Sequence, residues 1–262
     1  PGIWMKLLTI LTFVLMLAVN TLAVVLPING VSTGQAADAY PNLFTPAGIT
    51  FSIWSLIYIL LAAHVLYVLG LFREKETGID VQIFRRICVT FSISSAVNAA
   101  WIFSWHYGKI LLSMLLMLIL LNCLIKINVM ISKQTLSAKE RFFVRLPFTV
   151  YFGWITIATI ANAAVLLVSV GWDRFGLSEN IWTVIMLLAG MLIGLAVLLR
   201  FKTVSYSLVL IWAYTGILIK HTSVSGFAGQ YPAVIITAGI CLALFAASAG
   251  YLLLHFSLKG GQ

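Results

Sequence analysis

The chain has 262 residues, of which 62% are apolar and only 9% are charged. Soluble domains carry about 25% charged residues, so this composition excludes a soluble globular protein and predicts an integral membrane protein. The net charge of +9 does not indicate binding to nucleic acid, because the basic residues are spread over short loops between apolar runs.

Apolar runs long enough to cross a bilayer, which takes about 20 residues, recur along the whole chain. They predict an all-α fold, a polytopic membrane bundle of about eight transmembrane helices. We expect the spans at residues 7–26, 49–72, 87–105, 110–131, 147–171, 181–199, 204–219 and 232–256. The polar loop at 27–45 is long enough to fold over another part of the protein.

The basic residues divide unequally between the two sides of this eight-span arrangement. Lys109, Arg174 and Lys220 fall on one side. The other thirteen of the 16 are Lys6, Arg73, Lys75, Arg85, Arg86, Lys126, Lys133, Lys139, Arg141, Arg145, Arg200, Lys202 and Lys259. Since cytoplasmic loops collect Lys and Arg, we expect both termini to be cytoplasmic and the loop at 27–45 to face outward.

The second span begins with a turn and a row of aromatic side chains. We expect the Thr45 hydroxyl to cap this helix. Phe51, Trp54 and Tyr58 follow at spacings of three and four residues, which places them on one helical face. An aromatic belt at the membrane interface would also explain such residues, but two later spans repeat the pattern.

Spans three and five carry similar stripes, each with an amide. The residues are Asn98, Trp101 and Trp105 in the third span, and Tyr151, Trp154 and Asn162 in the fifth. If the three stripes converge, they would line a cavity for a large, flat, hydrophobic ligand. The alternative for the two amides is a hydrogen bond between helices, because an unpaired amide is costly in hydrocarbon.

Residues that would support catalysis or ion coupling are missing from the predicted spans. The seven acids, all expected in loops, are Asp38, Glu74, Glu76, Asp80, Glu140, Asp173 and Glu179. Neither an ion-coupled carrier nor a paired-carboxylate hydrolase is therefore indicated. His64 could ligate haem iron, although a lone intramembrane histidine is more often a hydrogen-bonded core residue. We predict no catalytic residue and no metal site.

The three stripes resemble those of the TspO/MBR family, the tryptophan-rich sensory proteins and the translocator protein. The matching residues are Pro46, Gly48, Phe51, Trp54 and Tyr58, then Asn98 and Trp101, then Tyr151, Trp154 and Asn162. The likeness covers about residues 5–171 and implies a TspO-like five-helix bundle, which we place at 1–171, with a pocket under the first long loop. Residues 172–262 would then form three additional transmembrane helices.

The resemblance implies a receptor or binding protein for a hydrophobic ligand, a tetrapyrrole such as a porphyrin or a sterol-like molecule. The ligand would bind between helices 2, 3 and 5, at Phe51, Trp54, Tyr58, Asn98, Trp101, Tyr151, Trp154 and Asn162. Porphyrin or haem would be a ligand rather than an obligatory cofactor. The alternatives are a transporter or permease for such a ligand and, less favoured, a porphyrin-degrading enzyme.

The expected partners are the lipid bilayer and a hydrophobic small molecule, with no nucleic acid, and the expected location is a bacterial plasma membrane. Small residues also suggest that the last three spans pack closely against the five-helix unit, with a homodimer face as the alternative. They are Gly190 and Gly194 in the sixth span, and Gly239, Ala243 and Ala247 in the eighth.

Overall fold

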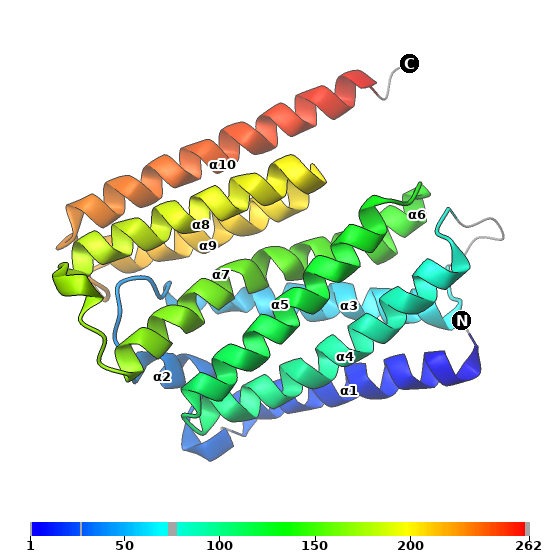
Figure 1. Ribbon diagram of the computed structural model, residues 1–262, viewed down its shortest axis with the longest axis horizontal. Helices are drawn as coiled ribbons and strands as arrows, with labels where there is room; N and C mark the ends of the chain where they lie inside the picture. Colours follow the sequence, from blue (N-terminus) through cyan, green and yellow to red (C-terminus); the bar gives the residue numbers. More distant parts are fainter. Residues whose placement is uncertain (1, 27, 73–77, 260–262) are drawn as a thin grey trace. The chain divides into compact units, whose positions relative to one another are not determined.

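The structure, a computed structural model, describes residues 2–26, 28–72 and 78–259, with side chains up to residue 254. Within these residues all regular structure is helical, and eight helices are long and apolar enough to cross a membrane (Figure 1). These helices span Ile3–Val25, Gly48–Leu69, Val81–His106, Ile110–Ser132, Ala138–Ser169, Glu179–Phe201, Val204–Thr222 and Pro232–Leu254. The predicted polytopic helical bundle is confirmed.

Two of these eight spans, Gly48–Leu69 and Ala138–Ser169, are built from more than one helical segment. The long helices are α1 (Ile3–Val25), α3 (Ile53–Leu69), α4 (Val81–His106), α5 (Ile110–Ser132), α7 (Leu146–Ser169), α8 (Glu179–Phe201), α9 (Val204–Thr222) and α10 (Pro232–Lys259). The short segments are η1 (Ile28–Gly30), α2 (Thr33–Asp38), η2 (Gly48–Ser52), α6 (Ala138–Glu140), η3 (Arg141–Arg145) and η4 (Arg174–Gly176). A helix of 23 residues, such as α1 or α5, is about 35 Å long and exceeds the roughly 30 Å hydrocarbon core.

Helix α4 begins six residues earlier than the sequence predicted. The Asp80 carboxylate accepts hydrogen bonds from the backbone N–H groups of residues 82 and 83, at 2.8 and 3.0 Å, and so caps the helix. Arg85 and Arg86, which we expected in a loop, therefore lie on the helix. The apolar run marks only the part of α4 that lies in hydrocarbon, whereas the cap sets where the helix starts.

The prediction that Thr45 caps the second span is wrong. Its hydroxyl donates a hydrogen bond to the Asn42 side-chain oxygen at 3.1 Å, and the same oxygen accepts the N–H groups of Phe44 and Thr45. An Asx turn of this kind competes with helix capping. The chain then enters α3 through the 3₁₀ segment η2, so Phe51 precedes the helix that carries Trp54 and Tyr58.

Of the five predicted loop acids that the structure describes, three lie in helices instead, among them Asp38 at the end of α2. Glu179 lies in the first turn of α8, and Glu140 lies in α6 with only 1% of its surface exposed. Glu74 and Glu76 lie outside the described residues. So do Arg73 and Lys75 of the predicted charge asymmetry, as well as the side chain of Lys259.

The Glu140 carboxylate holds a turn of the chain in place. It accepts the backbone N–H groups of Gly78 and Ile79, both at 3.1 Å, and that of Ser137 at 2.9 Å. A Cβ at Gly78 would overlap the carbonyl oxygen of Thr135, so this position requires glycine. Glu140 was not expected to be buried, because the sequence around it reads as a basic loop.

The chain divides into two compact units, and each is described by itself. The first comprises residues Pro1–Ala39 and Ile53–Ile155, and the second comprises Tyr40–Ser52 and Thr156–Gln262. The division therefore falls within α7. The predicted domains, 1–171 and 172–262, were drawn from a resemblance rather than from packing and stay a prediction.

In the first unit, α4 is the central helix. It packs against α1 on one side and α5 on the other, and α1 also packs against α3 (Figure 1). Apolar side chains that are completely buried form the core, including Met16, Ile57, Phe91, Leu124 and Phe148. On α1 the apolar side chain of Leu11 is 67% exposed, as expected for a helix that faces lipid.

In the second unit, α10 packs against α8 and α9 (Figure 1). The small residues of α8 serve this packing. A Cβ at Gly190 would lie 2.6 Å from the Tyr214 hydroxyl, and one at Gly194 would lie 2.6 Å from Leu210. The close approach at these two glycines is thus made to residues of α9, and packing of the last three spans against the five-helix bundle stays a prediction. A Cβ at Gly239 of α10 would meet nothing within 4 Å, and the homodimer stays a prediction.

The segment 40–52 lies along α9, held by a close contact at Gly216. The Ala47 N–H donates to the Gly216 carbonyl at 3.0 Å, and the Trp212 indole N–H donates to the Thr50 carbonyl at 2.9 Å. A Cβ at Gly216 would overlap the Thr50 hydroxyl oxygen. The backbone of Gly216 and the side chain of Thr50 thus pack together without room for another atom.

We therefore expect Gly216→Ala to lower the free energy of unfolding by about 1–3 kcal/mol, the usual cost of overpacking. Chemical unfolding in detergent measures this difference. Gly239→Ala is the matched control, since its new methyl group enters open space and alanine favours the helix. Equal stability of the two variants would contradict the close packing of Gly216 against Thr50.

Candidate functional site

Six of the eight predicted site residues come together in the first unit. They are Trp54 and Tyr58 from α3, Asn98 and Trp101 from α4, and Tyr151 and Trp154 from α7. Phe51 and Asn162 belong to the second unit. The convergence of the aromatic residues of three helices is seen, while the role of all eight in ligand binding stays a prediction.

Trp54 is the centre of this aromatic cluster. Its ring centroid lies 5.6 Å from that of Tyr58 in a stacked arrangement and 6.3 Å from that of Trp101. Tyr151 and Trp154 meet it edge to face at 6.0 and 6.2 Å. These separations are typical of favourable aromatic pairs.

The rings of the aromatic cluster differ in accessibility. Trp101, Tyr151 and Trp154 are buried, whereas Trp54 and Tyr58 are only half-buried. The spacing of four residues on α3 explains why the last two share a face. Trp54 and Tyr58 therefore form the part of the cluster that an incoming molecule would meet first.

The rings continue from the cluster toward the first long loop. Trp101 stacks on Trp105 with centroids 5.7 Å apart, and the Trp105 indole N–H donates to the Thr33 carbonyl at 3.1 Å. The sequence placed Trp105 in the stripe on α4 but not among the site residues. This residue connects the aromatic cluster to α2.

Residues 28–38 of this loop are fastened to the end of α4 by His106. One ring nitrogen, Nδ1, lies 3.1 Å from the Ile28 carbonyl, and Nε2 lies 3.0 Å from the Thr33 hydroxyl. The Asn29 amide donates to the His106 carbonyl at 2.9 Å. The His106 ring is buried and holds the loop.

A chain of hydrogen bonds runs behind the aromatic cluster from α1 to α7. The Asn20 amide donates to the Asn98 side-chain oxygen at 2.7 Å, and the Asn98 amide donates to the Tyr151 hydroxyl at 2.9 Å. The interhelical hydrogen bond that we considered for Asn98 is thus confirmed. Its effect is to hold the Tyr151 ring against Trp54. We overlooked Asn20, whose signal was a lone amide inside an apolar span.

The sequence matches the family model for TSPO-like proteins over residues 6–251. The chain belongs to the TSPO-like protein family. The match extends through α8 and α9 into α10, so the relationship is not confined to residues 5–171, where we had seen the resemblance. No curated protein and no solved structure matched the chain significantly.

Within the aromatic cluster of this TSPO-like protein, the polar end of the Tyr58 side chain calls for a partner. The Tyr58 hydroxyl is buried and has no hydrogen-bond partner among the described residues. Such groups are rare in folded proteins and call for an explanation. A ligand with a hydrogen-bonding group at this position would provide one.

His64 of the TSPO-like fold is a fully buried core residue. Its Nδ1 lies 2.9 Å from the Phe143 carbonyl in the π-helical turn η3. The rings of Phe148, Phe91 and Phe84 surround it, the first at 4.7 Å. In the described part of the chain, no three His, Cys, Asp or Glu side chains come together as metal ligands.

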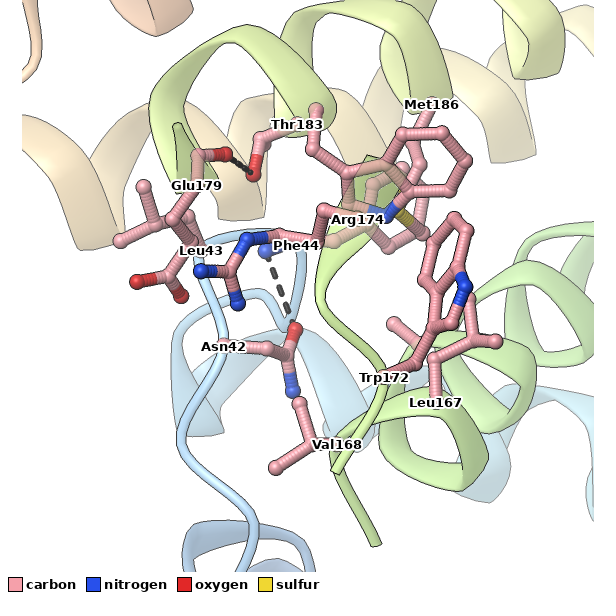
Figure 2. A pocket seen from close by; sticks show the side chains of 12 residues that line it. Asn42, Leu43, Phe44, Leu167, Val168, Trp172, Arg174, Glu179, Thr183 and Met186 are labelled. Carbon is pink, nitrogen blue, oxygen red and sulfur yellow. Dashed lines mark hydrogen bonds between the residues drawn. The ribbon is translucent and has the colours of Figure 1, made fainter. Parts of the chain in front are cut away.

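The second unit contains a separate small hollow, which Figure 2 shows. Its walls come from residues 42–44, 164–174 and 179–186, with the rings of Trp172 and Trp182 meeting edge to face at 4.7 Å. The volume of about 30 Å³ holds one or two water molecules. A tetrapyrrole would not fit, so this hollow is not the predicted pocket.

Proposed function

We propose that this TSPO-like protein is a membrane receptor or binding protein for a flat hydrophobic ligand of the tetrapyrrole class, bound at Trp54. One observation carries the proposal. The Trp54 ring has four aromatic neighbours from three helices, yet remains half-buried. Apolar walls with a few placed polar groups are the usual composition of a small-molecule site.

The aromatic cluster suggests how such a ligand would be held. Since the buried rings already contact one another, the macrocycle would stack on Trp54 and Tyr58 rather than enter between the others. The Tyr58 hydroxyl would supply a hydrogen bond, and the chain from Asn20 to Tyr151 would keep the rear of the cluster rigid. The loop segment 28–38 would act as a lid through Trp105 and His106.

The proposal is tested by titrating protoporphyrin IX into the purified protein in detergent, following tryptophan quenching and the porphyrin absorption band. We expect saturable binding that Tyr58→Phe weakens about 2- to 12-fold, the worth of one hydrogen bond. Tyr107→Phe is the matched control, since Tyr107 is 54% exposed and outside the aromatic cluster. Absence of saturable binding would contradict the proposal. Equal affinities of the Tyr58→Phe and Tyr107→Phe variants would show that the Tyr58 hydroxyl does not bind the ligand.

A further inference from the structure

A groove runs between the first turns of α4 and the last turns of α5, within the first unit. Its volume is about 500 Å³. One wall carries Arg85, Arg86 and Val89 from α4, and the other carries Lys126 and Ile125 from α5. The aromatic cluster contributes no residue to it, and the proposed function does not use it.

The groove has a strong and unbalanced charge. Arg85, Arg86 and Lys126 are all exposed, and no carboxylate lines the groove. Among the described residues none of the three has an ion pair or a side-chain hydrogen bond. The acid nearest in sequence, Asp80, is engaged as the cap of α4. Three cations in one groove, with no counter-charge from the described part of the chain, favour an anionic occupant.

The depth of these cations matches the headgroup region of a bilayer. Arg85 lies four residues inside the start of α4, and Lys126 lies six residues inside the end of α5. At 1.5 Å per residue these distances are about 6 and 9 Å. Both helices exceed the hydrocarbon thickness, so the charged groups reach the boundary where lipid phosphates lie.

The rest of the groove is suited to acyl chains. Val89 and Ile125 are 37% and 38% exposed, and Val129 and Met130 complete the apolar lining. A ligand with a phosphate at one end and hydrocarbon along its length would match both the three cations and the apolar lining of the groove. Arginine binds phosphate through two parallel hydrogen bonds, and basic pockets between transmembrane helices bind anionic headgroups.

We propose that the α4–α5 groove binds an anionic phospholipid, with Arg85, Arg86 and Lys126 holding the phosphate and the apolar lining holding an acyl chain. The lipid comes from the leaflet at the basic end of the spans, which the Lys and Arg distribution predicts to be cytoplasmic. The inference does not depend on porphyrin binding.

Thermal unfolding in detergent with increasing phosphatidylglycerol or phosphatidylcholine tests the lipid site, because a ligand of the folded state raises Tm with its concentration. We expect phosphatidylglycerol to raise Tm and phosphatidylcholine not to. In the triple variant Arg85→Gln, Arg86→Gln and Lys126→Gln, the apparent affinity should fall on the order of 100-fold. If the triple variant does not fold, Lys126→Gln alone should weaken binding about fivefold.

The matched control removes three other exposed cations, in the variant Lys109→Gln, Arg200→Gln and Lys202→Gln. It should respond to phosphatidylglycerol as the wild type does. Equal weakening in both triple variants, or equal stabilisation by the two lipids, would overturn the site. Inorganic phosphate that reproduces the stabilisation would overturn the assignment to a lipid.

Discussion

Trp54→Ala is expected to weaken protoporphyrin IX binding about 5- to 150-fold. Stacking of a flat ring system on one aromatic side chain contributes roughly 1–3 kcal/mol. Trp54 is also the ring that Trp101, Tyr151 and Trp154 support. The titration that measures affinity for the wild type measures this loss directly.

Two further variants separate stacking from folding. Trp54→Phe keeps a smaller aromatic face and should recover part of the affinity. Trp4→Ala removes an indole that is 82% exposed on α1 and should leave binding unchanged. If Trp54→Ala binds porphyrin as the wild type does while unfolding at the same temperature, Trp54 is not where the ligand stacks.

Glu140→Ala is expected to lower the free energy of unfolding by about 3 kcal/mol or more. The carboxylate is buried and accepts three backbone N–H groups, from Gly78, Ile79 and Ser137. Each buried donor left without an acceptor costs about 1–3 kcal/mol. Denaturant unfolding in detergent gives the difference.

Glu179→Ala serves as the control for removing a carboxylate. Glu179 lies in the first turn of α8, where its charge interacts favourably with the helix dipole, so we expect a loss of no more than about 1 kcal/mol. Glu140→Gln keeps one acceptor oxygen, so its loss in the free energy of unfolding should lie between those of Glu140→Ala and Glu179→Ala. The account of the buried carboxylate fails if Glu140→Ala is no less stable than Glu179→Ala.

The eight spans could be predicted because bilayer thickness fixes how long an apolar run must be. The ends of the helices could be predicted less accurately. Asp80 extends α4 beyond the apolar run, and Glu140 draws a stretch that reads as a basic loop into a buried turn. Both effects depend on contacts between residues that the hydropathy pattern does not encode.

The aromatic cluster could also be predicted only in part, because helical spacing fixes which residues share a face but not what that face contacts. Spacings of three and four residues place Trp54 with Tyr58 on one helix face and Asn98 with Trp101 on another. They do not tell which face meets which helix, so the partner of Asn98, Asn20, was missed. The link from Trp105 to Thr33 was missed because it depends on how the loop folds back.

A structure of the protein with protoporphyrin IX bound in a lipid nanodisc tests the central claim most directly. We predict the macrocycle in van der Waals contact with the Trp54 indole, with a polar group of the ligand within hydrogen-bond distance of the Tyr58 hydroxyl. Porphyrin bound elsewhere would contradict the account. One such outcome is a macrocycle whose carboxylates lie against Arg85, Arg86 and Lys126, with the rings around Trp54 unchanged.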